Sequence, residues 1–591
     1  MSFIGKIQRE LTLINGLQRT LKAYEPIEKG WPISVGKDVE RVVDLYPDNI
    51  AIRFEGESWT YRQFDARANA YAHWALAQGL GKGDRVALFM SNQPDYVACW
   101  VGLSKIGVVV ALINSHLTGG PLAHSLRISE ARHVVASPDL IDAYRGVAAN
   151  LPNDMRLWIL GEDLSEALAA APAERPAQSL RDAVTLEDLS LLVYTSGTTG
   201  APKAAKLLNR RTLGMMRAFT GAGYAVPADK VYVTLPLYHG TGGLCGVGFA
   251  LTTGATLIIK RKFSASQFWD DCIAEQATVF FYIGELCRYL LNQPESESDT
   301  KHQLRLGVGN GLRPEVWEQF QPRFKIKKLL EFYGSTEGNV SLMNFDGKIG
   351  AIGRIPKYLR KKVNVRIVKF DVETEQPVRG ADGLCVEAEP GEVGEAIGEI
   401  QDSARYRFEG YSGNEEQTQK KVLRDVFAKG DAWFRTGDLM RQDAEGYFYF
   451  IDRIGDTFRW KGENVSTNEV GEALARAPGV LEANVYGVKV GALDGRAGMA
   501  AITPGEGFDL AALRAHVARE LPSYARPIFL RIKRDIDTTG TFKYRKVDLV
   551  ADGFDPTKTS DPLYVDDPSV GAYAPLTPEH ARAIESGSVK L

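Results

Sequence analysis

The order of apolar and polar positions predicts alternating strands and helices through about three quarters of the chain. Apolar runs at 85–89, 256–259 and 278–282 have the length of buried strands. The last two runs are each followed by a segment with helical spacing of apolar side chains, at 264–275 and 285–292. Strands that alternate with helices in this way predict an α/β fold whose strands are largely parallel.

Two later stretches follow different patterns. Short strand patterns at 365–370, 393–400 and 447–451 are separated by Gly, Asp and Glu turns, which indicates a smaller β-rich subdomain. After about residue 456, helical and strand patterns mix in a compact α+β unit of roughly one hundred residues. Beyond residue 552 the chain is rich in Pro, Asp and Ser.

These patterns divide the chain into three expected parts. We expect a large N-terminal domain of layered α/β subdomains over 1–454, which includes the β-rich subdomain. A small and mobile α+β C-terminal domain follows over 455–555, and an extended tail over 556–591. Several domains are also expected because 591 residues exceed what one hydrophobic core supports.

The first 35 residues carry an amphipathic helical pattern. Its apolar members recur at three- and four-residue spacing and are Ile4, Ile7, Leu11, Ile14, Leu17 and Leu21. Such a helix either lies in a membrane interface or docks on its own protein, and we favour docking. No apolar run reaches the roughly 20 residues that a spanning helix requires.

Composition and charge narrow the class of protein. The chain has 71 basic and 74 acidic residues, so it carries no electrostatic footprint for a nucleic-acid duplex. Its isolated cysteines form neither a zinc pattern nor a disulfide framework; they are Cys99, Cys245, Cys272, Cys287 and Cys385. We therefore expect a cytoplasmic protein, with any membrane contact peripheral, through the N-terminal helix and on the inner face. A homodimer is left open.

The most informative segment is 194–206, which reads YTSGTTGAPKAAK and follows an apolar, strand-like run. Glycine lets the backbone approach a bulky anion, and the neighbouring N–H and hydroxyl groups can then bind phosphate oxygens. Lys203 can add a positive charge. The spacing differs from the common P-loop. A flexible loop is the alternative, but the preceding buried strand provides a defined anchor, so we favour phosphate binding.

Five further segments contain residues of chemical interest, although each is weak alone. They read PLYHGTGG at 236–243, GNGLRP at 309–314, YGSTEGN at 333–339, FRTGDL at 434–439 and DRIGDTFRWKGEN at 452–464. A lone histidine such as His239 is usually structural. Thr336 and Glu337 can simply cap a helix, and Gly437-Asp438 is an ordinary turn dipeptide.

In this order, the six segments resemble the adenylate-forming superfamily of acyl-CoA synthetases, luciferases and peptide-synthetase adenylation domains. The resemblance runs from about residue 39 to residue 548. Within the superfamily, the chain looks like the very-long-chain acyl-CoA synthetase/fatty acid transport protein branch. The segments that indicate this branch are 281–290 (FYIGELCRYL), 452–466, 539–543 (TGTFK), 561–566 (DPLYVD) and 573–577 (YAPLT).

The resemblance implies an ATP-dependent ligase that joins a long- or very-long-chain fatty acid to coenzyme A. Its substrates and cofactors would be ATP, Mg²⁺, coenzyme A and the acid. The acid would attack the α-phosphate of ATP, and the thiol of coenzyme A would then displace AMP. One alternative is a ligase for another acid, such as an aryl, bile or carnitine-like acid. The other is a membrane-associated uptake protein that acts by trapping the acid as its thioester.

The resemblance also implies roles in nucleotide binding. The β- and γ-phosphates would be held by Thr195, Ser196, Gly197, Thr198, Thr199 and Lys203. The adenine would lie between Tyr333 and the backbone of Gly309, Asn310 and Gly311. Thr336 would contact the α-phosphate, and Glu337 would hold Mg²⁺. Asp438 would accept hydrogen bonds from the ribose, and Arg453 would lie close to ribose and phosphate.

The remaining roles concern the acid, coenzyme A and domain motion. His239 would stand near the substrate carboxylate, with Gly243, Tyr282 and Gly284 along the acyl tunnel. Lys543 would bridge carboxylate and α-phosphate during adenylation. Trp460, Lys461 and Gly462 would face coenzyme A after the small domain rotates about Gly455.

The chain departs from the superfamily pattern at two places. Gly455 occupies the hinge position, where many relatives carry Asp or Lys, although the fatty acid branch shares the glycine. Phe542 precedes Lys543, where many relatives have glycine, so the alignment could instead place Lys546 as the adenylation lysine.

Overall fold

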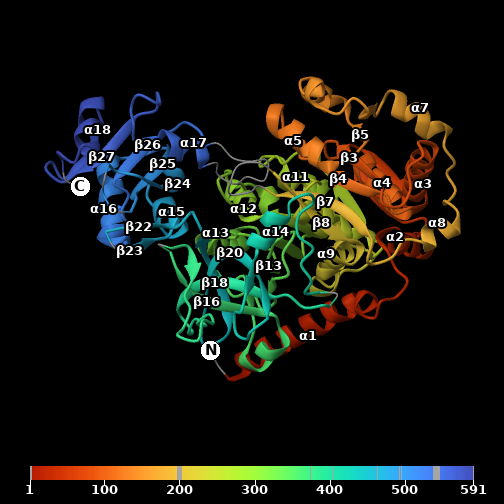
Figure 1. Cartoon of the computed structure of the whole chain (residues 1–591), viewed down its shortest axis with the longest axis horizontal. Coiled ribbons are helices and arrows are strands. Elements are labelled where there is room, and N and C mark those ends of the chain that lie inside the picture. The colour runs from red at the N-terminus through yellow and green to blue at the C-terminus, as the bar shows by residue number, and fades with distance from the viewer. Residues whose placement is uncertain are drawn as a thin grey trace. The chain divides into compact units, whose positions relative to one another are not determined.

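The computed structural model describes residues 3–195, 202–372, 374–403, 405–461, 463–491, 493, 495–536 and 546–589. The chain forms two compact units. The first unit comprises Met1–Asn364, Gly398–Arg424 and Ala432–Phe434. The second comprises Val365–Ile397, Asp425–Asp431 and Arg435–Leu591. Figure 1 shows the elements of both.

A six-stranded sheet occupies the N-terminal part of the first unit. Its strands, in spatial order, are β6 (Arg156–Ile159), β5 (His133–Ala136), β3 (Arg85–Phe89), β4 (Val109–Leu112), β7 (Leu189–Thr195) and β8 (Lys203–Leu208). The pairs between β6 and β7 are parallel, whereas β8 runs antiparallel to β7. The helices of this part are α3 (Tyr61–Ala77), α4 (Pro94–Lys105), α5 (Gly119–Ser129), α6 (Ile141–Arg145), α7 (Asp163–Ala170) and α8 (Gln178–Asp182).

An eight-stranded sheet forms the other layer of the first unit. Its strands, in spatial order, are β14 (Ser341–Asn344), β13 (Leu329–Gly334), β12 (Leu306–Asn310), β11 (Val279–Ile283), β9 (Lys230–Val233), β10 (Thr256–Ile259), β1 (Ile50–Phe54) and β2 (Glu57–Thr60). All pairs from β13 to β1 are parallel, and only the two edge strands are antiparallel. The parallel α/β fold predicted from the sequence is therefore confirmed.

The parallel strands are apolar along their length because helices cover the faces of the sheet. Val279, Phe280 and Phe281 are successive residues of β11, and all three are buried. The covering helices are α9 (Asn209–Ala222), α10 (Val247–Leu251), α11 (Phe268–Ala274), α12 (Gly284–Leu291) and α13 (Pro314–Arg323).

The N-terminal helix α1 (Phe3–Glu28) packs along α9 (Figure 1). The docking face contains Leu13 and Gly16, and a Cβ on Gly16 would overlap the ring of Phe345. The predicted docking is therefore present, but it uses a different face from the predicted stripe. Ile4, Leu11 and the other stripe residues except Leu17 are exposed. Helical periodicity identified the stripe, but the opposite face docks because α9 has a glycine at the contact, where a Cβ on Gly221 would overlap the Arg19 carbonyl oxygen.

The second unit is built on two sheets. In one of them the neighbours are, in order, β21 (Tyr447–Arg453), β20 (Ala432–Gln442), β18 (Val393–Glu399) and β16 (Val365–Asp371). The other has the order β24 (Val480–Val488), β25 (Ala497–Pro504), β26 (Phe529–Ile532), β27 (Leu563–Asp567) and β28 (Ala572–Pro575). Further elements are β17 (Gln376–Pro377) beside β16, the hairpin β22 (Phe458–Trp460) and β23 (Glu463–Val465), and the helices α15 (Thr467–Ala475), α16 (Leu510–Glu520), α17 (Val547–Asp552) and α18 (Pro578–Glu585).

The prediction of an extended tail over 556–591 is wrong. Strand β27 pairs with β26, β28 pairs with β27, and α18 follows. Leu563 and Val565 alternate with polar residues and bury their side chains, as does Ile584 in α18. The Pro- and Asp-rich composition obscured this short alternation, which becomes a strand because β26 offers a free edge.

Two further expectations concern the cysteines and the length of apolar helices. All five cysteines are buried and unpaired, as a reducing environment predicts. Within the described part of the chain, no helix is both long and apolar enough to cross a membrane.

Candidate active site

Most of the predicted site residues of the first unit gather at one end of the eight-stranded sheet. The carboxyl ends of the parallel strands β9, β11, β12 and β13 lie at this end, the usual place for ligands in open α/β sheets. These ends and the turns after them carry His239, Tyr282, Gly284, Gly309, Asn310, Gly311, Tyr333, Thr336 and Glu337.

Glu337 and Lys203 both contact the side chain of Tyr411. The Tyr411 hydroxyl donates a hydrogen bond to Glu337 Oε1 at 2.9 Å. Lys203 Nζ lies 5.6 Å from the centre of the Tyr411 ring and donates to Gln417 Oε1 at 2.7 Å. Gln417 belongs to α14 (Glu415–Lys420). A cation near the ring and a carboxylate at the hydroxyl of one tyrosine are groups that can bind phosphate and its metal ion.

Burial shifts the pKa values of Lys203 and Tyr411. Desolvation lowers the pKa of the Lys203 ammonium, and the charge of Lys421 adds to this effect while Glu337 opposes it. Burial raises the pKa of the Tyr411 phenol, and the neighbouring Glu337 carboxylate raises it further. Tyr411 therefore stays protonated at neutral pH and keeps donating to Glu337.

Thr336 lies in a turn that a partly buried arginine, Arg211, holds. Arg211 of α9 donates to the carbonyl oxygen of Ser335 at 2.9 Å and to that of Thr336 at 3.4 Å. The Thr336 hydroxyl also faces the turn after β9, because a Cβ on Gly240 would lie 3.6 Å from Thr336 Oγ1. The turns that carry Thr336 and His239 are therefore neighbours.

His239 directly precedes a π-helix, Gly240–Gly246. Its ring is partly buried and lies 4.5 Å from the ring of Tyr238. A Cβ on Gly243 would overlap the carbonyl oxygen of Leu237. Packing alone therefore requires glycine at this position. Thr241 Oγ1 lies 3.3 Å from Asn310 Oδ1, which joins the π-helix to the end of β12.

The predicted adenine and acyl-tunnel residues pack against one another. Tyr282 and Gly309 are opposite each other in the parallel pair of β11 and β12. A Cβ on Gly309 would overlap the Tyr282 carbonyl oxygen, and one on Gly284 would overlap the carbonyl oxygen of Gly311. The glycines in this pattern let two backbone segments approach closely at the place where the two predicted binding surfaces meet.

Glu331 is a buried carboxyl group beneath this place, and sequence reasoning missed it. Its Oε2 accepts from the Tyr282 hydroxyl at 2.7 Å, and its Oε1 accepts from the Leu312 N–H at 2.9 Å. Burial raises the pKa of Glu331 to about 8, although these hydrogen bonds oppose the rise. The available signal was a single carboxylate within the apolar run LLEFYG of β13.

Tyr411 and Arg211 were also missed. Neither stands in one of the six segments, and both act through residues that do. Tyr411 is reached from Lys203 through backbone pairing, since the N–H of Lys206 donates to the Gly410 carbonyl at 3.2 Å. No local pattern connects residues so far apart in the chain.

Asp438 and Arg453 face each other within the second unit. They are paired residues of the antiparallel strands β20 and β21, and Arg453 Nε lies 3.7 Å from Asp438 Oδ1. Arg453 is exposed, whereas Asp438 is partly buried. This arrangement leaves the guanidinium exposed beside a carboxyl group.

The predicted hinge residue, Gly455, lies two residues after Arg453 in the chain. Gly455 has a φ of +91°, which disfavours any residue with a side chain, although a Cβ there would meet no atom within 4 Å. The Asp456 N–H donates to the Arg453 carbonyl at 3.1 Å and closes the turn.

The predicted coenzyme A residues differ in exposure. Trp460 is buried in the core of the second unit, whereas Lys461 is exposed and its Nζ lies 5.8 Å from the Trp460 ring centre. Lys546 Nζ donates to Thr467 Oγ1 at 2.9 Å and lies 3.3 Å from Asp456 Oδ2. The predicted residues Ser196, Gly197, Thr198, Thr199, Gly462 and Lys543 lie outside the described residues.

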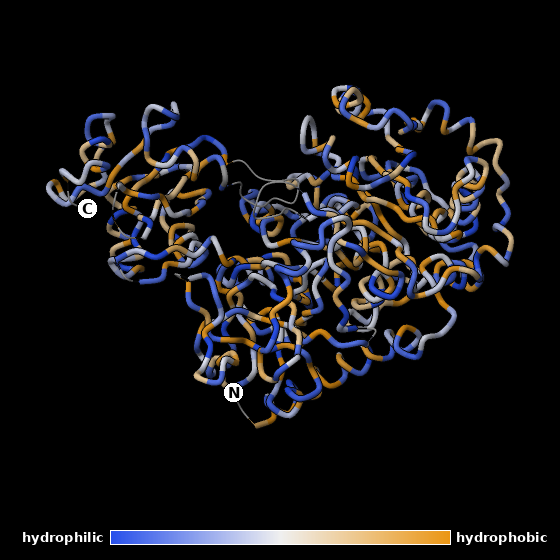
Figure 2. Tube along the Cα trace, viewed as in Figure 1, coloured by the Kyte–Doolittle hydropathy of each residue, from blue (hydrophilic) through white to orange (hydrophobic). Residues whose placement is uncertain are grey.

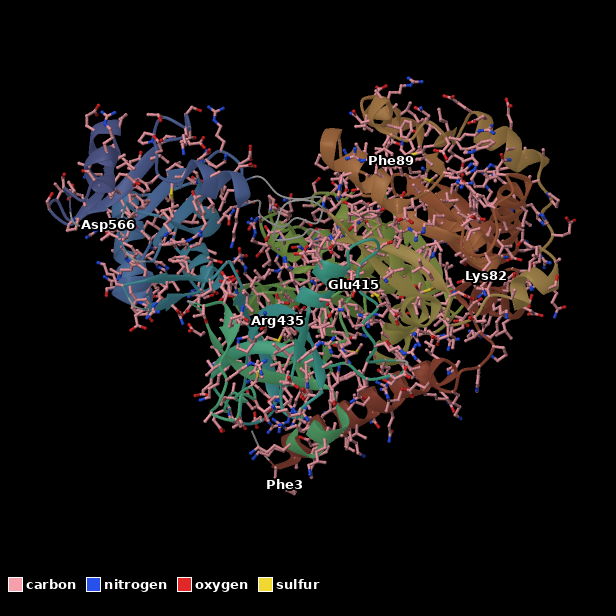
Figure 3. All side chains as sticks on the ribbon, viewed as in Figure 1. Phe3, Lys82, Phe89, Glu415, Arg435 and Asp566 are labelled. Carbon is pink, nitrogen blue, oxygen red and sulfur yellow. The ribbon has the colours of Figure 1, made fainter. Side chains whose placement is uncertain are left out.

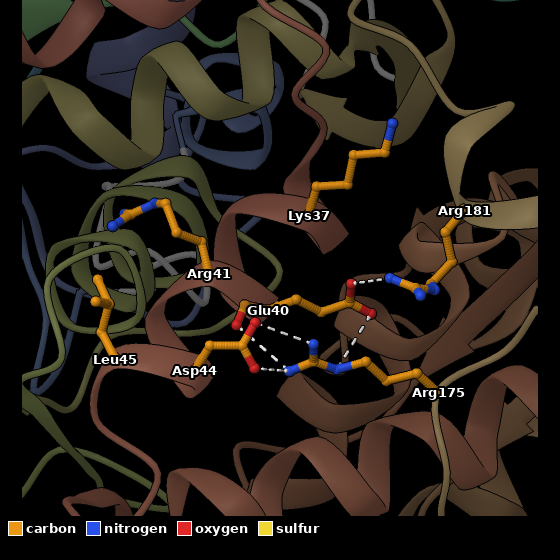
Figure 4. A pocket seen from close by; sticks show the side chains of 7 residues that line it. All are labelled: Lys37, Glu40, Arg41, Asp44, Leu45, Arg175 and Arg181. Atoms are coloured by element: carbon orange, nitrogen blue, oxygen red, sulfur yellow. Dashed lines mark hydrogen bonds and ion pairs between the residues drawn. The ribbon is translucent and has the colours of Figure 1, made fainter. Parts of the chain in front are cut away.

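A cavity of about 400 Å³ lies elsewhere in the first unit, beside α2 (Val35–Leu45) (Figure 4). Glu40 Oε2 binds Arg181 at 2.6 Å, and Asp44 binds Arg175 at 2.7 Å. No predicted site residue lines this cavity. Its ion pairs hold the segment around Arg175 and α8 against α2.

Two family profiles match the chain. The profile described as AMP-binding enzyme covers residues 39–399, and that of the AMP-binding enzyme C-terminal domain covers 469–543. The chain belongs to the AMP-binding enzyme family. Family membership confirms the resemblance drawn from the sequence and supports an adenylate-forming acid–CoA ligase that uses ATP and coenzyme A.

This AMP-binding enzyme is also similar to individual curated proteins. Long-chain fatty acid transport protein 6 of Mus musculus is 44% identical, over 92% of this chain and 89% of that protein. Long-chain fatty acid transport protein 1 of Homo sapiens is 42% identical, over 93% of this chain and 87% of that protein. The alignments therefore span nearly the whole of each protein.

Solved structures of other proteins share the fold of this AMP-binding enzyme. A benzoate CoA ligase from Burkholderia xenovorans has a TM-score of 0.74 at 22% identity, covering 88% of this chain and 100% of that one. A fatty acyl CoA synthetase of Mycobacterium tuberculosis has a TM-score of 0.62 at 24% identity, covering 88% and 98%. At these identities, the likeness concerns the fold.

Proposed function

We propose that this enzyme is an ATP-dependent ligase that joins long- or very-long-chain fatty acids to coenzyme A. The observation that carries the proposal is the meeting of Lys203 and Glu337 at Tyr411, close to the Thr336 turn. The names of the similar long-chain fatty acid transport proteins support the substrate class.

In the first half-reaction, an oxygen of the fatty acid carboxylate attacks the α-phosphorus of ATP. The bond from that phosphorus to the pyrophosphate oxygen breaks, and acyl-AMP and pyrophosphate form. Lys203 offsets the negative charge of the departing pyrophosphate, and the Thr336 hydroxyl donates to the α-phosphate. Glu337 is a suitable ligand for Mg²⁺, which supplies positive charge to the phosphates when bound.

Adenine and ribose are held by different groups. Tyr333 stacks on the base, whose other side lies against the backbone of Gly309, Asn310 and Gly311. Asp438 accepts hydrogen bonds from the ribose hydroxyls, and the exposed Arg453 lies beside them. The fixed glycine contacts support a narrow slot for a flat ring.

In the second half-reaction, the thiol sulfur of coenzyme A attacks the acyl carbon of acyl-AMP. The bond to the AMP oxygen breaks, AMP departs, and the thiol proton passes to the solvent as the thioester forms. His239 orients the carboxyl end of the acid, while Gly243, Tyr282 and Gly284 line its path. Rotation about Gly455 brings the segment with Lys461 to coenzyme A.

Lys543 is our candidate for the lysine that bridges carboxylate and α-phosphate. The engagement of Lys546 with Thr467 and Asp456 supports this assignment, because a lysine with two partners serves the small domain itself. We expect Lys543→Ala to abolish pyrophosphate exchange and Lys546→Ala to retain most of it. The reverse order of loss would reassign the role to Lys546.

The substrate class is tested by a panel of acids with ATP and coenzyme A, read as AMP formed. Palmitate and a very-long-chain saturated acid are expected to release AMP far faster than benzoate, a bile acid or carnitine. Omission of coenzyme A should stop turnover after adenylation. Higher rates with benzoate than with fatty acids would show that the substrates are aryl acids. No AMP release with any acid would reject the proposed ligase activity.

A further inference from the structure

Helix α1 has two apolar faces, and only one of them packs on the protein. The other face, here called the outer stripe, consists of Phe3, Ile4, Ile7, Leu11, Ile14 and Leu21. Ile4 is 75% exposed and Leu11 53% exposed. Phe3 lies at the outer end of the helix (Figure 3). Figure 2 shows the resulting change between hydrophobic and hydrophilic residues along α1.

An exposed apolar face of this size is expected to bind a partner. Single exposed apolar side chains are common, but six on one helical face make a contiguous patch, which usually marks an interaction site. The opposite face is fixed against α9, where the Arg19 Nε donates to the Gly221 carbonyl at 3.1 Å. The helix is therefore a firm support for the stripe.

A basic segment flanks the outer stripe. It is the 3₁₀ helix Lys357–Lys362, of sequence KYLRKK, here called the basic segment. The Tyr358 hydroxyl donates to Glu10 Oε2 at 2.8 Å, and Arg354 NH2 donates to Glu10 Oε1 at 2.6 Å. These contacts place the basic segment beside the first half of α1, and its four basic residues are exposed.

The acidic residues of α1 do not cancel this charge. Glu10 is bound to Arg354, Glu25 to Lys29, and Glu28 to Arg405. Two lysines on α1, Lys6 and Lys22, are also exposed. The surface around the outer stripe therefore has an excess of positive charge.

We propose that the outer stripe and the basic segment dock this protein on an anionic lipid bilayer. The stripe would lie at the boundary of headgroups and acyl chains, with α1 in the plane of the membrane. The basic segment would lie against the negatively charged headgroups.

A second copy of the chain fits this surface less well. In a two-fold interface the same patch meets itself, so the lysines of two basic segments would be brought near each other. Like charges at such an interface oppose association. A bilayer offers both an apolar layer and the opposite charge.

The test measures binding of the full chain to large unilamellar vesicles by co-sedimentation, without ATP or fatty acid. Vesicles contain either phosphatidylcholine alone or phosphatidylcholine with phosphatidylglycerol. We expect binding to the anionic vesicles, weaker binding to the neutral ones, and loss of the difference at high salt. Because no substrate is present, the result does not depend on the proposed ligase activity.

Two variants separate the two parts of the surface. Ile7→Gln/Leu11→Gln should lower the partition coefficient at least about tenfold on both vesicles, because it removes apolar burial. Lys357→Gln/Lys361→Gln/Lys362→Gln should lower it only on anionic vesicles, by roughly fivefold per lysine, which corresponds to about 1 kcal/mol each. All five positions are exposed, so thermal unfolding should be nearly unchanged.

Matched control variants carry the same kinds of substitution at exposed positions outside the outer stripe and the basic segment. Leu45→Gln/Leu180→Gln changes two exposed leucines, and Lys429→Gln/Lys489→Gln/Lys558→Gln removes the same charge from the second unit. Neither should weaken binding. Equal losses in test and control variants, or no binding of the unaltered chain to anionic vesicles, would overturn the proposal. A dimer that the Ile7→Gln/Leu11→Gln variant dissociates, without vesicle binding, would assign the stripe to a second copy.

Discussion

Tyr411 connects the two charged residues on which phosphate chemistry depends. Its hydroxyl orients Glu337 at 2.9 Å, and its ring lies beside Lys203. The distance between a cation and a carboxylate in a buried site determines whether they neutralise each other or both face a ligand. Lys203 and Glu337 each contact a different part of Tyr411, the ring and the hydroxyl, and no ion pair between the two is observed among the described residues.

Substitutions at this group should have graded effects on adenylation. Glu337→Gln should lower pyrophosphate exchange by a factor of at least about one hundred, because a neutral amide binds Mg²⁺ poorly. Tyr411→Phe should lower it by roughly fivefold, the value of one hydrogen bond of about 1 kcal/mol. The measurement is isotope exchange between pyrophosphate and ATP with palmitate present. A larger loss in the tyrosine variant would show that Glu337 is not the metal ligand.

Glu331 should make stability depend on pH. Its pKa is raised from 4.5 to about 8 in the folded chain, so the folded state holds a proton that the unfolded state releases. The associated stability is complete below pH 4.5 and is lost as pH rises towards 8, by roughly 1.4 kcal/mol per pH unit between these values.

The Glu331→Gln variant removes this titration. Urea unfolding at pH 6 and pH 8 should show a smaller fall in stability for the variant than for the unaltered chain. Glu415→Gln, at an exposed position, is the matched control and should leave the fall unchanged. An equal fall in all three proteins would mean that Glu331 is ionised throughout this range.

At the scale of elements, the π-helix Gly240–Gly246 joins three parts of the site. It directly follows His239, contacts Asn310 through Thr241, and lies against Thr336 through Gly240. A π-helix is rare and often occurs at functional sites. Its glycines permit backbone approaches that any side chain would prevent.

Gly243→Ala should therefore damage both stability and activity. The added Cβ meets the carbonyl oxygen of Leu237, a backbone atom that cannot turn away. We expect a loss of about 1–3 kcal/mol in unfolding free energy, measured with urea. Gly471→Ala is the control, because its Cβ would meet only Val485 at 3.9 Å. Equal stability of both variants would contradict this geometry.

At the scale of the whole molecule, the chain divides into two compact units, and the proposed reaction uses residues from both. Lys203 and Glu337 belong to the first unit, whereas Asp438, Arg453 and Gly455 belong to the second. A two-step reaction with one mobile domain can present different residues in each step.

Gly455→Pro should separate the two steps. Proline fixes φ near −65°, whereas Gly455 has a φ of +91°, so the substitution restricts the proposed hinge. We expect thioester formation to fall at least about tenfold more than pyrophosphate exchange, because only the former needs the rotation. Gly507→Pro, another exposed glycine at φ +76° in the second unit, controls for general strain. Comparable losses in both assays would remove the hinge from the mechanism.

The elements of the fold could largely be predicted from local patterns. The apolar runs at 85–89 and 256–259 coincide with β3 and β10, because buried parallel strands are apolar throughout. The short strands after residue 556 could not be predicted. Their pairing depends on the edge of β26, which lies outside the segment itself.

The sequence by itself determined the chemistry that this protein can offer, because the hydroxyls, lysines, glycines and carboxylates of its motifs are local properties. It also determined that α1 has an apolar stripe. Only the tertiary structure decided that Tyr411 meets Glu337, that Tyr282 meets Glu331, and that the stripe faces outwards. Periodicity shows that a face is apolar, but what covers that face depends on the packing of residues distant in the chain.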